Sequence, residues 1–225
     1  MQKEWSENDL KEIARQLGKP DGELGLKTGL MMNKSNGAMI KRTTGLLHIQ
    51  DNEQVLELGP GNGAHVAELM SDLVGVHYTG VDISETMIRE ANKMNEDLIS
   101  QHQVSFELSN GERLPFKDDS FQKIFTVNTI YFWKNPKDYA QEIFRVLNVG
   151  GTFCLALAAK SFMENLPFTQ YGFHLYDKES AMELMRTAGF YVAEIIEELD
   201  ITIGNMGQQV EREIVILICR KSGSS

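Results

Sequence analysis

The sequence predicts an α/β fold, in which a mostly parallel β-sheet carries helices on both faces. Short apolar runs alternate with amphipathic segments along the chain, as in repeated strand–helix units. Residues 152–158 are continuously apolar, which is typical of a strand buried on both faces. Residues 54–66 pass from a short apolar run through a glycine cluster into an amphipathic segment. They therefore predict a strand, a turn and a helix in immediate succession.

Two helices are expected before the sheet. Ser6 is a favourable N-cap with Asp9 three residues later, and the apolar stripe that follows ends before Gly18. The glycines and the proline of residues 18–25 predict a loop, and a second helix is expected over residues 37–47.

The N-terminal segment, residues 1–48, is too short to form a domain of its own, so we expect a helical cap on the sheet. It has two interpretations, a lid over a ligand site or a cover for apolar surface, and the sequence does not choose between them. A lid would need hinges. The glycines that could provide them are Gly18, Gly22, Gly25 and Gly29.

Seven strands are expected after the cap. They are residues 55–58, 76–81, 104–108, 123–128, 152–158, 191–197 and 213–220. Three of the intervening helices begin at recognisable caps, namely Ser84, the Asn135–Pro136 pair and Asp177. Residues 204–209 are expected to form an exposed turn.

The composition limits the classes of function and partner that the sequence allows. With 225 residues and 42% apolar content the chain can bury a full core, so residues 49–221 are predicted to be one domain and residues 222–225 a flexible tail. A net charge of −10 argues against a nucleic-acid partner and favours a small molecule. No stretch is long and apolar enough for a membrane span. Cys154 and Cys219 lie in apolar runs, which predicts buried free thiols and a cytoplasmic protein.

The glycine turn after residues 55–58 is the candidate ligand site, because glycines let backbone N–H groups approach a ligand closely. Gly59-x-Gly61-x-x-Ala64, with Asp82 about 20 residues later, formally fits a dinucleotide fingerprint. Glu57 favours another ligand. A buried carboxylate needs a partner and would repel a pyrophosphate, whereas the cationic S-adenosylmethionine would suit it.

Four motifs in order resemble those of the class I S-adenosylmethionine-dependent methyltransferases, of the methyltransferase type 11 and quinone-biosynthesis kind. They are Val55-Leu56-Glu57-Leu58-Gly59-Pro60-Gly61-Asn62-Gly63, Gly80-Val81-Asp82-Ile83-Ser84, Leu114-Pro115-Phe116 with Asp119-Ser120-Phe121, and Arg145-Val146-Leu147-Asn148-Val149-Gly150-Gly151. The resemblance implies a Rossmann-like, seven-stranded, mostly parallel sheet with helices on both faces, an antiparallel last strand and an N-terminal helical cap.

The resemblance also implies the residues that bind the cofactor, S-adenosyl-L-methionine, whose product is S-adenosyl-L-homocysteine. They are Glu57, Gly59, Pro60, Gly61, Asn62, Gly63, Asp82, Ile83, Met87, Asn110, Gly111, Glu112 and Asn128. Asp82 would accept hydrogen bonds from both ribose hydroxyls. Asn110 stands where relatives commonly carry an aspartate for the adenine amino group, and an amide oxygen can still accept that bond.

The substrate side is expected at the aromatic exit of residues 128–133, in residues 160–177 and in the cap. Tyr131 and His174 are the candidate catalytic residues. The candidate substrate and lid residues are Met32, Asn33, Tyr131, Trp133, Tyr171 and His174. The predicted reaction moves a methyl group to an oxygen, nitrogen or carbon of a small molecule, and no metal is expected.

Two other functions and the oligomeric state stay open. An NAD-dependent oxidoreductase could use the same kind of sheet, although Glu57 and the later motifs count against it. A non-catalytic S-adenosylmethionine-binding module would carry the same Gly59, Gly61, Gly63 and Asp82. The sequence also leaves open whether the protein forms a homodimer.

Overall fold

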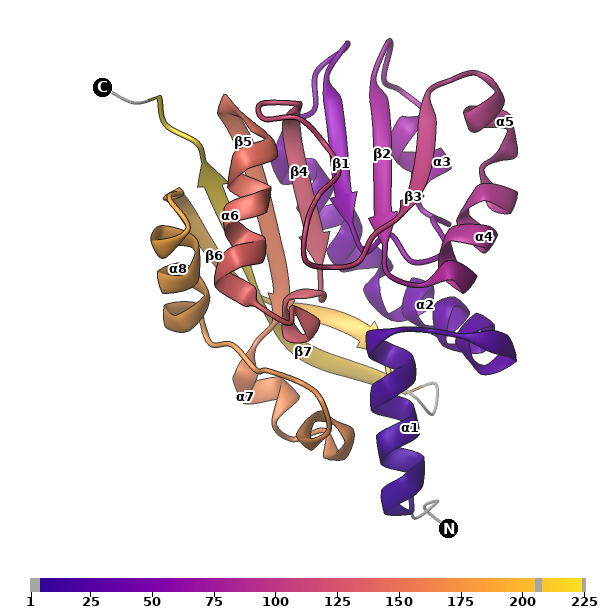
Figure 1. Cartoon of the computed structure of the whole chain (residues 1–225). Coiled ribbons are helices and arrows are strands. Elements are labelled where there is room, and N and C mark those ends of the chain that lie inside the picture. Colours follow the sequence, from indigo (N-terminus) through magenta and orange to yellow (C-terminus); the bar gives the residue numbers. More distant parts are fainter. Residues whose placement is uncertain (1–4, 205–207, 224–225) are drawn as a thin grey trace.

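The computed structural model describes residues 5–204 and 208–223, which form one seven-stranded sheet with surrounding helices (Figure 1). The strand order is β3-β2-β1-β4-β5-β7-β6. The strands are β1 (Gln54–Leu58), β2 (His77–Asp82), β3 (Val104–Leu108), β4 (Phe121–Val127), β5 (Leu147–Ala158), β6 (Tyr191–Ile203) and β7 (Gln209–Arg220). Only β7 runs antiparallel to its neighbours, which confirms the predicted fold class.

The helices cover both faces of the sheet. They are α1 (Glu7–Gly18), α2 (Gly22–Leu47), α3 (Val66–Met70), α4 (Glu85–Met94), α5 (Glu96–Ser100), α6 (Pro136–Val146), α7 (Lys160–Met163) and α8 (Lys178–Thr187), with 3₁₀ turns η1 (Ile130–Phe132) and η2 (Pro167–Gln170). In Figure 1, α6 and α8 lie in front of the sheet and α2 lies behind it.

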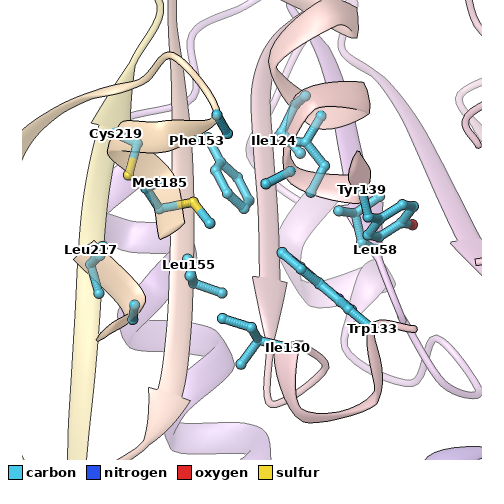
Figure 2. Close-up of a cluster of buried hydrophobic side chains, with 14 of the residues drawn as sticks. Leu58, Ile124, Ile130, Trp133, Tyr139, Phe153, Leu155, Met185, Leu217 and Cys219 are labelled. Atoms are coloured by element: carbon cyan, nitrogen blue, oxygen red, sulfur yellow. The ribbon is translucent and has the colours of Figure 1, made fainter. Parts of the chain in front are cut away.

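The core has two layers because successive strand residues point to opposite faces. On β1, Leu56 and Leu58 join the cluster beneath α6 and α8, whereas Val55 joins the cluster beneath α2, α3 and α4. Figure 2 shows the first cluster, in which Phe153 and Leu155 of β5 lie between the helices and the sheet. Cys154 and Cys219 are buried and unpaired, as predicted.

The N-terminal segment differs from the prediction. The capping box between Ser6 and Asp9 confirms the start of α1, but α2 begins at Gly22 and not near residue 37. Gly25 and Gly29 lie inside this helix and are buried. They are therefore points of close packing and not loop hinges, because a Cβ on Gly25 would lie 2.7 Å from the backbone carbon of Pro20.

The C-terminal strands are longer than predicted. Register pairs join β6 and β7 from Tyr191 with Arg220 to Ile203 with Gln209, so this hairpin extends beyond the sheet toward α1 (Figure 1). Charged residues in residues 198–213 obscured the strand pattern in the sequence. Part of the predicted exposed turn at residues 204–209 lies outside the described residues, as does part of the predicted tail.

Two glycines of α2 give a matched test of this helix. Gly25→Ala should lower the free energy of unfolding by about 1 to 3 kcal/mol, because the added methyl meets the Pro20 backbone. Gly45→Ala, where a Cβ meets nothing within 4 Å, should raise it by about 0.5 to 1 kcal/mol through helix propensity. Urea unfolding of both variants measures these changes. A stabilising Gly25→Ala would contradict the close packing of α2 on the turn before it.

Candidate functional site

A cavity of about 1260 Å³ lies at the carboxyl ends of the parallel strands. Its walls come from the segments that follow β1, β2, β3, β4 and β5, from α1 and α2, and from the far part of the β6–β7 hairpin. The strand order reverses beside β1, since β2 and β3 lie on one side of it and β4 and β5 on the other. Open α/β sheets bind their ligands at such a position.

The glycine turn after β1 forms part of the cavity wall. Gly59, Gly61 and Gly63 have φ angles of 76°, 58° and 65°, in the left-handed region that favours glycine. A Cβ on Gly59 would lie 2.4 Å from the Thr129 side chain, whereas Gly61 has nothing within 4 Å of the position of a Cβ. Gly61 therefore opens onto free space that a larger residue would occupy.

Glu57 has partners within the protein. Its Oε2 lies 2.7 Å from His65 Nε2 and also accepts a hydrogen bond from the Tyr78 hydroxyl, while the residue is 1% exposed. Burial lowers the pKa of His65, but the charge of Glu57 and the hydrogen bond to it outweigh burial and raise that pKa. The expectation that this buried carboxylate needs a partner holds, and the partners His65 and Tyr78 come from the protein itself. Glu57 still lines the cavity.

Asp82 connects the ends of β1 and β2. Its carboxylate accepts hydrogen bonds from the backbone N–H of Gly61, at 3.1 Å, and of Ser84, at 2.9 Å. Burial raises the pKa of Asp82 to about 6, although these two N–H groups lower it and the charge of Glu57 raises it further. The side chain lines the cavity, so it can accept hydrogen bonds from a ligand there.

The aromatic exit from β4 is held in place by a polar network. The Tyr131 hydroxyl lies 3.0 Å from Asn128 Oδ1 and 2.9 Å from the Ala158 carbonyl oxygen. Burial raises the pKa of Tyr131 well above its ordinary value. The Trp133 indole donates to the Thr129 hydroxyl at 3.2 Å. Tyr131 is therefore a neutral hydrogen-bond donor that fixes the shape of the cavity.

The structure brings most of the predicted site residues to one cavity. Those that line it are Glu57, Gly59, Pro60, Gly61, Asp82, Ile83, Met87, Asn110, Gly111 and Asn128, with Met32, Asn33, Tyr131 and Trp133 on the substrate side. Five predicted residues do not line it, namely Asn62, Gly63, Glu112, Tyr171 and His174.

Each of these five has another place in the structure. Glu112 is exposed and forms an ion pair with Lys134. His174 is exposed, and its ring lies 4.7 Å from that of Tyr176, while Tyr171 lies beneath the ammonium of Lys11. Asn62 is buried and its Oδ1 accepts a hydrogen bond from the Ala64 N–H, whereas Gly63 shapes the turn itself.

Two segments that the sequence assigned to the substrate side do contribute to the cavity. Phe162, Leu166 and Phe168 come from residues 160–177, and Ile13, Leu17 and Ile40 come from the N-terminal cap. Sequence reasoning missed Thr202, Val210 and Arg212, which come from the β6–β7 hairpin. No pattern in the sequence indicated that the β6–β7 hairpin would reach the cavity.

Residues 56–155 match the family described as a methyltransferase domain. This part of the chain is therefore similar to the methyltransferase domain. This match confirms the resemblance to class I S-adenosylmethionine-dependent methyltransferases that the four sequence motifs indicated.

The curated relatives that the chain matches are distant. The O-methyltransferase resE of Aspergillus sclerotiorum is 27% identical over 177 residues, which are 75% of this chain and 64% of the fungal protein. The chain spans less than two thirds of the length of the curated relatives that it matches first.

Solved structures share its fold. A methyltransferase of Haloferax volcanii, solved in complex with the Trm112 methyltransferase activator, is similar with a TM-score of 0.74 and 19% identity over 88% of this chain and 94% of that one. Geranyl diphosphate C-methyltransferase of Streptomyces coelicolor A3(2), solved with Mg²⁺, geranyl diphosphate and S-adenosyl-L-homocysteine, has a TM-score of 0.68 at 13% identity and covers 92% of this chain and 87% of its own.

The described residues contain neither a membrane-spanning helix nor a metal-binding group of side chains. Within residues 5–204 and 208–223, no helix combines the length and the apolar character needed to cross a membrane. Over the same residues, no three His, Cys, Asp or Glu side chains are grouped so that they could hold a metal ion.

The raised pKa of Asp82 predicts a pH effect on stability. Between its ordinary value of 3.8 and about 6, the folded protein holds a proton that the unfolded chain has released. Stability from this group is therefore lost as pH rises through that window. Relative to Asp82→Asn, the free energy of unfolding of the natural protein should fall by roughly 1 to 3 kcal/mol between about pH 4 and pH 6.5. Urea unfolding at several pH values tests this, and parallel curves for the two proteins would contradict it.

Proposed function

We propose that the protein transfers a methyl group from S-adenosyl-L-methionine to a small-molecule acceptor. The observation that carries the proposal is the position of Asp82 and the glycine turn, side by side in one wall of a cavity of about 1260 Å³. Small-molecule sites are usually about 300 to 1,000 Å³. The cavity therefore has room for a cofactor and an acceptor together.

The chain's own residues fit the cofactor. The ionised Asp82 would accept hydrogen bonds from ribose hydroxyls, and the free space at Gly61 would receive the methionine part close to the backbone. Ile83, Asn110 and Gly111 lie beyond Asp82 on the cavity wall and would enclose the adenine. When bound, the cofactor would supply a sulfonium methyl group. The electrons of the C–S bond would stay on sulfur, and a lone pair of the acceptor would form the new bond to the methyl carbon.

The remaining task of the protein is to orient the acceptor and exclude water. Tyr131, Trp133 and Phe132 line the cavity where β4 ends, and the first two are held by hydrogen bonds to Asn128 and Thr129. Tyr131 is neutral and donates its proton within the network, so we assign it to positioning. An acceptor that carries a proton would lose it to bulk water outside the cavity.

Of the two sequence arguments against the oxidoreductase alternative, Glu57 is now the weaker one. Glu57 has partners in His65 and Tyr78, so it does not need a cationic ligand. The methyltransferase domain match over residues 56–155 supports methyl transfer instead.

Cofactor binding is the first test. Asp82→Ala should weaken S-adenosylmethionine binding by about 1 to 3 kcal/mol, or roughly 5- to 150-fold, through lost hydrogen bonds to an ionised group. Gly61→Val should abolish binding, because its side chain fills the free space. Asp72→Ala, on an exposed residue, is the matched control. Isothermal calorimetry measures all three, and unchanged affinity in both site variants would refute the placement of the cofactor.

Turnover separates an enzyme from a binding module. The protein, S-adenosylmethionine and a panel of phenols, amines and activated ring carbons should release S-adenosylhomocysteine in amounts that match a methylated product by mass spectrometry. Gly61→Val should release none. Tight cofactor binding without release across the panel would favour the non-catalytic module.

A further inference from the structure

Strand β6 forms one edge of the sheet, because β7 is its only neighbour in the strand order. Register pairs join the two strands from Tyr191 with Arg220 to Ile203 with Gln209. Within the described residues, no backbone hydrogen bond joins residues 191–203 to a segment other than β7. The outer N–H and C=O groups of β6 are therefore free to pair with another strand.

The first half of β6 is protected against such pairing. Its register with β7 shifts between Val192 and Glu194, and the side chains of Glu194 and Glu197 are exposed. Bulges and exposed charges are usual devices that keep an edge strand from taking a partner.

The second half of β6, residues 199–203, carries none of these devices. It extends beyond the other strands toward α1 (Figure 1). Leu199, Ile201 and Ile203 point to one face of the hairpin and are 63%, 63% and 47% exposed. Asp200, the charged residue of this segment, points to the other face, where it is buried and paired with Arg212. An apolar row on a free edge invites aggregation unless a specific partner covers it.

Residues 199–203 are complementary to a second copy of themselves. If two such strands pair antiparallel with Ile201 at the centre, Ile201 of one copy lies opposite Ile201 of the other. Leu199 then lies opposite Ile203, and Asp200 lies opposite the uncharged Thr202. The three apolar side chains of each copy meet apolar side chains on the same face, which is the pairing that stabilises a sheet.

Charge selects this register over its neighbours. With Ile201 at the centre, Glu198 lies opposite Gly204 and meets no acid. A centre at Asp200 would place two aspartates directly opposite each other and Ile203 opposite the exposed Glu197. Like charges in directly opposite positions destabilise a strand pair. A shift by a single residue would break the apolar row, because it exchanges the two faces of the strand.

We propose that the protein forms a symmetric dimer in which the β6 strands of two copies pair antiparallel about Ile201. The two seven-stranded sheets then become one continuous sheet. Ile203 also lines the cavity, so Leu199 of one copy covers a residue in the cavity wall of the other. This dimer goes beyond the proposed function and does not depend on it.

The mass of the protein in solution is the first test. In sedimentation velocity at high micromolar concentration, the natural protein should have twice the mass of one chain. Ile201→Lys should have the mass of one chain, because two lysines would lie opposite each other. Val149→Lys, whose parent side chain is 59% exposed near the start of β5, is the matched control and should stay dimeric. A monomeric natural protein would overturn the proposal, as would a dimeric Ile201→Lys.

Cysteine cross-linking tests the register, and it does not require the lysine variant to fold. Directly opposite residues of an antiparallel pair have Cα atoms about 4.5 to 5.5 Å apart, which is within disulfide range. Under mild oxidation, Ile201→Cys should therefore form a covalent dimer on a non-reducing gel. Leu199→Cys, whose parent side chain is equally exposed, should not link to itself, because about 13 Å of extended strand would separate the two thiols.

A mixture of Leu199→Cys and Ile203→Cys should form the covalent dimer that Leu199→Cys alone does not, since these two positions lie opposite each other. The natural Cys154 and Cys219 are buried and give no background. Self-linking of Leu199→Cys as complete as that of Ile201→Cys would contradict the register. Failure of Ile201→Cys to link would contradict the pairing itself.

Discussion

The hydrogen bond from the Gly61 N–H to the Asp82 carboxylate is the contact on which the cavity depends. It joins the turn after β1 to the end of β2, two segments that are already aligned by the parallel pairing of Leu58 with Val81. Glycine is required at this turn because its φ angles are positive. The same carboxylate also accepts from Ser84 at the start of α4, so one buried side chain connects the glycine turn and the start of a helix beside the cavity.

The N-terminal cap is built onto this arrangement. The Ser84 hydroxyl donates to the Pro20 carbonyl oxygen, and Gly29 of α2 packs against Met87 of α4. Farther along α2, Met39 is buried against β4, β5 and β7. The cap therefore covers apolar surface and also contributes residues to the cavity wall.

The cavity wall contains residues from inside and from outside the range that matches the family. Residues 56–155 contain the glycine turn, Asp82 and the end of β4. Other residues of the cavity wall come from before and after that range, in α1 and α2, in the segment after β5 and in the β6–β7 hairpin. Cavity residues that lie outside the matched range are a physical reason why distant relatives with a similar domain can act on different substrates.

The sequence by itself determined the succession of strand, glycine turn and acid at this end of the cavity. The apolar run, the glycine turn and the acid of β2 are local patterns, and local patterns are set by the short-range sterics of glycine and the two-residue period of strands. It also determined the caps at Ser6, Ser84 and Asp177, because a cap is a contact between residues three positions apart.

Only the tertiary structure decided which buried charged and polar side chains pair with one another. Glu57 takes its partner from His65 after the turn and from Tyr78 on the next strand. Arg212 meets Asn36 across 176 positions of sequence. It also decided that His174 and Tyr171 stay outside the cavity lining while Trp5 and Arg212 enter it. Such contacts depend on how the cap and the hairpin pack on the sheet, and no short-range period in the chain encodes that packing.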